Sequence, residues 1–392
     1  MASSPDLAHR LRALPAAAPL PDVLPEALIV GGAVRDLLLG GAPEDLDLVI
    51  EGDAVEAAQR LAQALGGSVT VHERFGTATV EAGGHVYDLA TARVETYARP
   101  GALPDVRPGT LGEDLLRRDF TVNAIAVALD GRAVAAPYAY EDLDARVLRV
   151  LHERSFLDDP TRLLRLVRYA TRLGFAVEEE TASLASAAID GGALATVTPP
   201  RIGSELRLLL REPSAVEALA WVARWPLGVA LSFDRSLALR ALELLPPDGR
   251  GDLLLLGSAC RSAELAELAG WLDARGFPAR ERDTVVCLAQ ADGIEGRLTG
   301  ASRRSEIAAA ARSVPVEAVA LAGALGAEAP ARAWIEELRR VTLDIDGADL
   351  LAAGIPQGEG LGRALAAALD ARLDGAAPDR DAQLAIALAA AR

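Results

Sequence analysis

The sequence predicts an α+β protein in which a small mixed sheet occupies roughly the first third of the chain and helices form the remainder. Short apolar runs alternate with amphipathic helical patterns between residues 26 and 137, which is typical of a domain that combines strands and helices. After about residue 138 the strand pattern almost disappears, and Ala and Leu recur with helical periodicity. A chain of 392 residues also exceeds one ordinary core, so roughly two to four domains are expected.

The elements of the first domain, the head, follow from these periodicities. Strands are expected over residues 28–30, 46–50, 68–71, 77–81, 85–90 and 122–129. Helices are expected over residues 33–40, 53–65 and 111–118. Residues 92–110 contain three prolines and two glycines, so they are expected to form an ordered or flexible excursion from the head.

The same pattern sets the expected domain limits. We expect a helical or weakly ordered leader and then the head, followed by three all-helical segments termed neck, body and tail. Their ranges are 1–25 for the leader, 26–137 for the head, 138–212 for the neck, 213–330 for the body and 331–392 for the tail.

Composition limits the possible environment and partners. The net charge is −16, which argues against a protein that coats nucleic acid through its overall field, so any polyanion must meet a local arginine patch. No apolar run approaches the roughly 20 residues that span a bilayer, and the N-terminal segment does not have the pattern of a signal peptide. The two cysteines, Cys260 and Cys287, lie in helical surroundings and suit a reducing compartment. A cytoplasmic protein without a membrane partner is therefore expected, and no protein partner is inferred.

The first candidate motif joins a glycine turn to a pair of aspartates. Gly31 and Gly32 end an apolar run, Arg35 follows in a helical stretch, and Asp45 and Asp47 flank Leu46 at the start of the next run. Residues i and i+2 of a strand share a face, so the two carboxylates project together and favour a divalent cation between them. Either motif alone is more often a structural turn or a solvated acidic pair. Their combination favours a site for phosphate and metal.

The second motif is RRDFTVN over residues 117–123, at a helix-to-strand junction. Its two arginines beside a carboxylate are equally consistent with an internal ion-pair network and with a site that binds a triphosphate. The chain contains no lysine and a single asparagine, Asn123, which indicates a GC-rich coding bias. The survival of that one amide within the motif indicates a structural or catalytic need for it.

The third motif is DDPTRLLRLVRYATRLGF over residues 158–175. Asp158 or Asp159 is expected to cap a helix whose first residue is Pro160, and the following arginines recur every three residues along one face. A solvated basic stripe is the ordinary interpretation. The alternative is that Asp159 and Arg162 read a base, because a carboxylate accepts from an amino group while a guanidinium donates to the adjacent ring nitrogen. Cytosine and adenine present that pattern, whereas guanine and uracil present the reverse.

These three blocks closely resemble the main motifs of the class II tRNA nucleotidyltransferase/poly(A) polymerase family. The resemblance continues at RIGSELRLLL, residues 201–210, and over residues 344–375, so it spans nearly the whole chain. It implies a polymerase-β-like nucleotidyltransferase head that adds C and A to the 3′ end of tRNA from CTP and ATP. It further implies that the helical tail binds tRNA.

The resemblance also implies roles for individual residues. Asp45 and Asp47 are the implied catalytic ligands of two Mg²⁺ ions, with Asp88 as a possible third carboxylate or supporting group. Gly32 and Arg35 are implied to hold the triphosphate with help from Arg118. The full set of implied nucleotide-binding residues is Gly31, Gly32, Arg35, Arg117, Arg118, Asp119, Asn123, Asp159, Arg162, Arg165 and Arg168.

Departures from the family pattern leave alternatives. The base-reading motif usually begins Glu-Asp, but here it begins Asp158-Asp159, so the role of the first acid is open. The sequence contains no His-Asp pair, and the excursion that CC-only relatives shorten looks complete. A-adding, CC-adding or poly(A)-adding activity therefore stays possible beside CCA addition, although the acidic balance argues against poly(A). Two other classes of protein fit the sequence less well. An inactive RNA-binding module would have no use for the paired aspartates. A small-molecule nucleotidyltransferase would have no use for the neck arginines.

Overall fold

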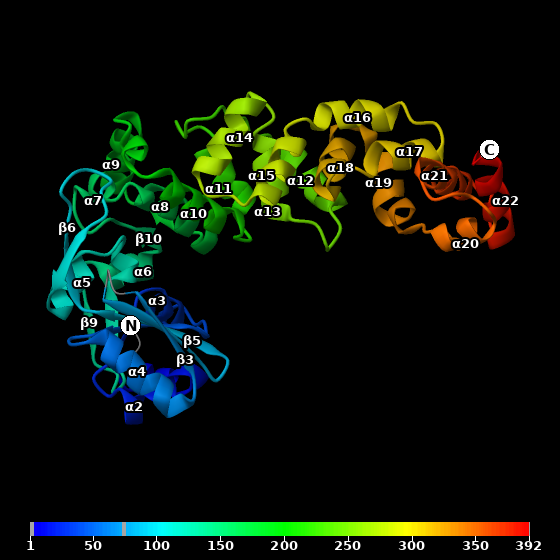
Figure 1. Cartoon of the computed structure of the whole chain (residues 1–392). Coiled ribbons are helices and arrows are strands. Elements are labelled where there is room, and N and C mark those ends of the chain that lie inside the picture. Colours follow the sequence, from blue (N-terminus) through cyan, green and yellow to red (C-terminus); the bar gives the residue numbers. More distant parts are fainter. Residues whose placement is uncertain (1–3, 73–75, 392) are drawn as a thin grey trace. The chain divides into compact units, whose positions relative to one another are not determined.

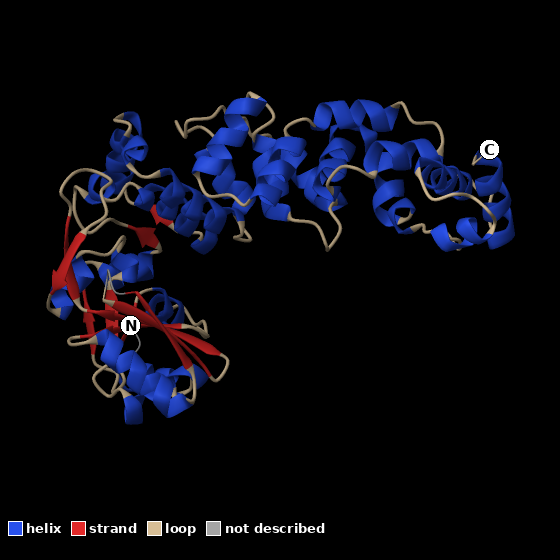
Figure 2. Cartoon of the chain, viewed as in Figure 1, coloured by secondary structure: helices blue, strands red, loops and turns tan. Residues whose placement is uncertain are grey.

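Strands lie near the beginning of the chain and helices fill the rest, as Figure 2 shows. The computed structural model describes residues 4–72 and 76–391, so residues 1–3 of the expected leader fall outside the described residues. The chain divides into two units, Met1–Thr198 and Pro199–Arg392. The expected α+β class, with a mixed sheet followed by helices, is confirmed.

A seven-stranded sheet in the order β3-β4-β5-β2-β1-β8-β9 forms the head. Only the β2–β5 pair is parallel, and the other neighbouring strands are antiparallel, so the sheet is mixed. Its strands are β1 (Leu28–Val30), β2 (Leu46–Ile50), β3 (Ser68–His72), β4 (Thr77–Ala82), β5 (His85–Thr91), β8 (Ile125–Ala128) and β9 (Ala133–Ala135).

Alternation along the strands gives the sheet two different faces. Leu46 and Leu48 of β2 are buried, whereas Asp47 between them is exposed. Helix α4 (Ala54–Leu65) begins at an Asp53 cap, ends at left-handed Gly66 and packs its buried side against β2 to β5. The face that carries Asp47 lacks this cover near the start of β2 and therefore stays accessible.

The remaining helices of the first unit surround the sheet or follow it. They are α1 (Ser4–Arg12), α2 (Leu20–Val23), α3 (Gly32–Leu38), α5 (Leu111–Leu116), α6 (Ala139–Ala145), α7 (Ser155–Asp158), α8 (Thr161–Leu173) and α9 (Glu179–Asp190). The described part of the leader is helical, and Leu11 and Leu20 bury it against the head. Two short parallel strands, β10 (Val147–Leu148) and β11 (Ala176–Val177), flank α8.

The structure resolves one expectation that was left open and differs from another. The excursion is ordered, because β6 (Arg93–Thr96) and β7 (Asp105–Pro108) pair as an antiparallel hairpin. The strand expected over 122–129 is wrong at its start, since residues 121–123 form a 3₁₀ turn before β8 begins at Ile125. The reason is that buried side chains of Thr121 and Asn123 bind Asp142 and Asp119, which holds the backbone out of the strand.

The second unit is helical throughout its described residues. Its helices are α10 (Pro199–Leu210), α11 (Ala215–Val222), α12 (Arg235–Leu244), α13 (Gly251–Ala259), α14 (Leu265–Ala274), α15 (Ala279–Leu288), α16 (Ala291–Thr299), α17 (Arg304–Ala311), α18 (Val316–Ala322), α19 (Glu328–Glu336), α20 (Gly347–Ala352), α21 (Glu359–Leu373) and α22 (Arg380–Ala390), several of which Figure 1 labels. Helices α20 to α22 share a small apolar cluster centred on Leu350, Ala364 and Ala387.

The helices are short or interrupted in relation to the thickness of a bilayer. Across residues 4–72 and 76–391, no single helix is both long and apolar enough to cross a bilayer. One pair, residues 304–311 and 316–340, passes the test only when combined and is bent by 119°.

Candidate active site

Three aspartates line the open face of the head sheet. Asp47 lies within β2, and its register partner in the parallel neighbour β5 is Asp88. Asp45 directly precedes β2, and its Oδ1 accepts from the backbone N–H of Val86 at 3.3 Å. The expectation that Asp45 and Asp47 project side by side thus agrees with the strand register, and β5 brings Asp88 to the same row.

Neighbouring charges and partial dehydration both change the pKa of the Asp47 carboxyl. An apolar cluster that includes Val30 and Val49 adjoins it, and the resulting loss of hydration raises the pKa of the Asp47 carboxyl. Asp88 and Asp45 raise this pKa further, whereas Arg118 and Arg165 oppose the rise. Carboxylates that disfavour one another's ionisation are a natural place for a cation.

The donor set fits a divalent metal of the Mg²⁺ type. Mg²⁺ prefers carboxylate oxygens and is commonly held by one or two of them, with waters and substrate phosphates completing its shell. Among the residues that the structure describes, no three Asp, Glu, His or Cys side chains converge closely enough to hold an ion by themselves. Asp45 and Asp47, with Asp88 beside them, therefore suit an ion that also needs phosphate ligands.

The glycine turn after β1 lies directly beside the aspartates. Gly31 has φ +70°, and a Cβ built on it would stand 3.1 Å from Nη1 of Arg118 and 3.4 Å from Oδ2 of Asp47. A side chain would therefore be strained in its backbone and crowded against both neighbours. Glycine here lets the chain run between a cation and a carboxylate, and Gly32 then begins α3.

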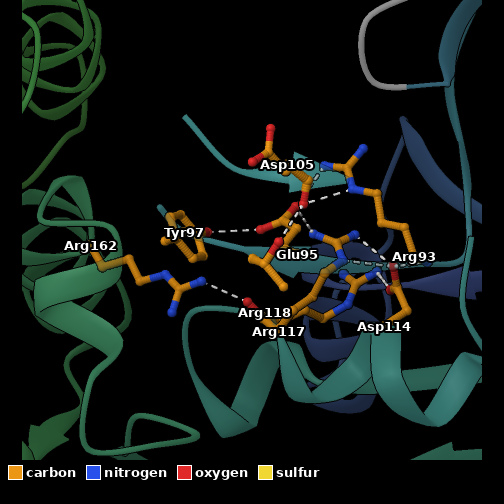
Figure 3. Close-up of polar contacts among 9 residues, drawn as sticks. Arg93, Glu95, Tyr97, Asp105, Asp114, Arg117, Arg118 and Arg162 are labelled. Carbon is orange, nitrogen blue, oxygen red and sulfur yellow. Dashed lines mark hydrogen bonds and ion pairs between the residues drawn. The ribbon is translucent and has the colours of Figure 1, made fainter. Parts of the chain in front are cut away.

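Arg117 and Arg118 share one buried carboxylate, Asp114 of α5. Arg117 donates to Oδ1 of Asp114 at 2.6 Å, and Arg118 donates to Oδ2 at 2.9 Å. Burial would raise the pKa of Asp114, but the two guanidinium groups hold it below its ordinary value. Arg117 also donates to Glu95 of β6 at 2.9 Å, and Figure 3 shows how this network connects the hairpin to α5.

The two arginines therefore differ in what they can reach. Arg117 serves the internal network that the sequence analysis left open, and its contact with a nucleotide stays a prediction. Arg118 points one nitrogen to Gly31 and lies near enough to oppose the rise in the pKa of Asp47. It is the better-placed cation for a phosphate bound beside Asp47.

Asn123 connects two further members of the predicted site. Its Nδ2 donates to Oδ1 of Asp119 at 3.0 Å, and its Oδ1 accepts from Arg35 at 2.6 Å. Arg35 is only 2 % exposed and also pairs with Asp36, so its guanidinium lies beneath the surface. The structure thus gives Arg35 a supporting position, and direct contact with a triphosphate remains a prediction.

Asp119 fastens α8 to the head. Arg165 donates to its Oδ2 through Nε at 2.9 Å and Nη2 at 2.6 Å. Burial would raise the pKa of Asp119, yet Arg165 and the Asn123 hydrogen bond hold it at about 2. The guanidinium carbons of Arg35, Arg165 and Arg168 lie 5.3, 5.4 and 5.1 Å from the ring centre of Tyr169. These distances place the half-buried ring among three cations.

Asp159 and Arg162, the pair predicted to read the base, lie at the start of α8. Oδ1 of Asp159 accepts from the Thr161 backbone N–H and hydroxyl at 3.1 and 2.7 Å, so this carboxylate binds the first helical residue from one position before the cap. The expected first residue is off by one, because the helix begins at Thr161 and the fixed ring of Pro160 occupies the cap position. Arg162 is 5 % exposed and donates to Ser155 Oγ and to the carbonyl of Arg117. Asp158 instead pairs with Arg154 near the surface.

Tyr97, in the loop after β6, joins this region although the sequence analysis did not select it. Its hydroxyl donates to Glu95 at 2.8 Å. Burial raises the pKa of Tyr97, and Glu95, Arg162 and Asp159 also act on it through their charges. Asp114 and Glu95 were missed in the same way, because they lie outside the three motifs, and Tyr169 was missed although it lies within the third motif. The signal in the sequence that could have identified Asp114 and Glu95 is that each acid lies just before or within an arginine-rich segment.

The fold and this arrangement of residues define a class of protein. Residues 27–149 match the family described as the poly A polymerase head domain. The head sheet and the paired aspartates agree with that match, so residues 27–149 form a head domain of this family, and the chain as a whole is similar to tRNA nucleotidyltransferases.

Individual relatives carry more specific names. The chain is 44% identical over 220 residues to an A-adding tRNA nucleotidyltransferase of Halalkalibacterium halodurans, covering 54% of this chain and 52% of that protein. It is 33% identical over 390 residues to an A-adding tRNA nucleotidyltransferase of Geobacter sulfurreducens, covering 92% and 44%. The chain thus spans about half, or less, of the length of these curated relatives. Other relatives are named CC-adding tRNA nucleotidyltransferase and CCA-adding enzyme.

Solved structures resemble the chain over nearly its full length. A Thermotoga maritima CCA-adding enzyme in complex with a tRNA superposes with a TM-score of 0.78 at 26% identity, covering 98% of both chains.

Proposed function

We propose that this protein adds C and A nucleotides to the 3′ end of tRNA, using CTP and ATP and releasing pyrophosphate. One observation carries the proposal: three motifs that are far apart in sequence share contacts. Gly31 adjoins Asp47 and Arg118, and Arg162 of α8 donates to the carbonyl of Arg117. Phosphate, metal and base functions can therefore act on one nucleotide.

The chemistry follows from these positions. Asp45 and Asp47 would hold Mg²⁺, which supplies charge neutralisation and lowers the cost of ionising the attacking hydroxyl. The RNA 3′ oxygen forms a bond to the α-phosphorus, and the bond from that phosphorus to the bridging oxygen breaks. Pyrophosphate leaves and the hydroxyl proton passes to water. Arg118 beside Gly31 stabilises the negative charge of the phosphates.

Selection of C and A would rest on Asp159 and Arg162. The carboxylate accepts from an exocyclic amino group, and the guanidinium donates to the adjacent ring nitrogen, so UTP and GTP present mismatched groups. Asp159 is fixed by Thr161 and Arg162 by Ser155, which gives both groups defined orientations before a nucleotide binds. The two free cysteines, Cys260 and Cys287, suit the cytoplasm as the compartment of this activity.

Addition of the terminal A alone is a second candidate, favoured by the names of the two relatives above. CC-only addition is less well supported, since the β6–β7 hairpin is complete and anchored by Arg117.

Extension assays distinguish these activities. The full chain is incubated with tRNA transcripts that lack the last three nucleotides, lack only the final A, or are complete, with CTP and ATP given singly and together. CCA addition requires that the shortest transcript be completed when both nucleotides are present. Extension of only the transcript that lacks A would assign the A-adding activity, and growth of the complete transcript would assign poly(A) addition.

An Asp47→Ala variant separates chemistry from binding in the same assay. Without this carboxylate we expect incorporation to fall by about a thousandfold or more, while the Kd for tRNA changes little. A variant that retains an undiminished rate would contradict the metal assignment.

A further inference from the structure

The open face of the head sheet continues past the aspartates onto β5, β4 and β3. The strand registers align Asp47 with Asp88, Asp88 with Thr79, and Thr79 with Thr70. Directly opposite residues on neighbouring strands share a face, so two carboxylates and two hydroxyls form one row across four strands. None of the three motifs of the sequence analysis includes the β3 and β4 part of this row.

A recess lies over part of the row. Its polar lining consists of Asp47, Asp88, Thr77, Thr79, His72 and Arg118. Thr70 is exposed on the same face but does not line the recess, which His72 at the end of the same strand does. The recess therefore extends from Asp47 across β5 and β4 and reaches the end of β3 at His72.

Asp88 is held in one orientation inside this recess. The hydroxyl of Thr79 donates to Oδ1 of Asp88 at 2.6 Å. The other oxygen, Oδ2, accepts no hydrogen bond from the residues that the structure describes. Asp88 is also exposed, so this oriented acceptor is available to a ligand in the recess.

The in-line geometry of the reaction indicates which part of the substrate occupies the recess. In phosphoryl transfer the attacking oxygen and the leaving pyrophosphate lie roughly in line on opposite sides of the phosphorus. Gly31, the turn placed for the phosphates, lies toward β1, whose Val30 is the register partner of Asp47, and Arg118 and Val30 line the recess at this end. The attacking hydroxyl must then approach Asp47 from the β5 side, where the recess lies.

We propose that this recess seats the terminal ribose of the acceptor RNA, with its 2′-hydroxyl donating to Asp88 while Thr79 fixes the carboxylate. Adjacent strands are about 4.8 Å apart, a distance that a ribose covers when its 3′-hydroxyl reaches Asp47 and its 2′-hydroxyl reaches Asp88. The 2′-hydroxyl is the group by which proteins distinguish RNA from DNA. Thr79 is thus a positioning residue. The inference rests on the proposed function and adds the binding site for the RNA end.

Steady-state extension of two acceptor RNAs, ending in ribose or in 2′-deoxyribose, tests the inference with the full chain. For wild type, the KM for RNA should be about tenfold lower with the ribose end, which is the effect of one hydrogen bond to a charged group. Thr79→Val should raise the KM for the ribose-ended RNA by roughly five- to tenfold and leave the KM for the nucleotide within about twofold. Thr79→Ser keeps the hydroxyl and should restore the wild-type value.

Thr70→Val is the matched control, because it makes the same change on the same face outside the recess, and its KM for RNA should equal that of wild type. An unchanged KM for RNA in Thr79→Val would overturn the inference. So would an equal rise in the KM for the nucleotide, or a preference for the ribose end that survives in Asp88→Asn. If wild type extends neither RNA, the proposed function itself fails, and this result is distinct from a failure confined to the variants.

Discussion

Asn123 shows at the scale of one residue why a rare amide persists in this chain. It is the only asparagine, and its side chain donates to Asp119 while it accepts from Arg35. An aspartate of the same shape could accept from Arg35 but could not donate to a second carboxylate. The amide thus joins an anion to a cation inside the head, which is the need that composition alone indicated.

Removal of this amide should lower stability. For Asn123→Ala we expect the free energy of unfolding to fall by roughly 2 kcal/mol, because Arg35 and Asp119 each lose a buried hydrogen bond. Urea denaturation measures the change. Arg132→Ala removes an exposed pair with Asp130 and should change the same quantity by less than about 0.5 kcal/mol. Equal effects of the two substitutions would contradict a structural role for the amide.

Arg162 is the residue that should decide nucleotide choice. Arg162→Ala should reduce the preference for CTP over UTP, measured as the ratio of kcat/KM values, by about ten- to a hundredfold, since the lost donor is worth about 1–3 kcal/mol. Arg154→Ala removes an exposed arginine that pairs with Asp158 and should leave the ratio unchanged. If the ratio is unchanged in both variants, Arg162 does not read the base.

At the scale of elements, the attachment of α8 to the head depends on the ion pair between buried Asp119 and half-buried Arg165. The pKa of Asp119 is about 2 in the folded protein, below the ordinary value of 3.8. A depressed carboxyl pKa stabilises the fold above the ordinary value, and this contribution is lost as pH falls toward the folded value. The pair should therefore hold at neutral and mildly acidic pH and weaken between about pH 4 and pH 2.

Comparison of wild type with Asp119→Asn measures this contribution. We expect the difference in the free energy of unfolding to be larger at pH 6 than at pH 2 by about 2 kcal/mol, as the pKa shift requires. Urea titrations at the two pH values would measure it. A difference that does not change with pH would mean that Asp119 is not ionised at neutral pH in the folded protein.

Elements with a strong local pattern could be predicted from sequence. The alternation in residues 46–50 gave β2 and the shared face of Asp45 and Asp47, and Gly31 followed from the end of an apolar run. The hairpin of residues 93–108 could not be predicted, because its anchors are long-range ion pairs. Glu95 pairs with Arg117, which lies 22 residues away in sequence. Tyr169 was missed for the same reason, since its neighbours Arg35 and Phe120 come from other elements.

At the scale of the whole molecule, each unit has an apolar core made from its own residues. In the first unit, a cluster that includes Val30, Leu115 and Ala126 packs beside the sheet. In the second, one cluster runs from Leu237 to Leu373 and another surrounds Leu350. Every residue predicted to contact nucleotide or metal lies in the first unit, whereas the predicted tRNA-binding tail lies in the second. Nucleotide binding and tRNA binding should therefore be separable.

A fragment of residues 1–198 tests this separation. Because the first unit has its own core, the fragment should unfold cooperatively, and its Kd for CTP and ATP should stay within about threefold of the full chain. Its Kd for tRNA should rise by about tenfold or more, because the tail is absent. Thermal unfolding followed by circular dichroism, with titration of each ligand, measures all three. A fragment that folds but binds neither nucleotide would show that nucleotide binding requires the second unit, and tRNA affinity equal to that of the full chain would remove the predicted role of the tail.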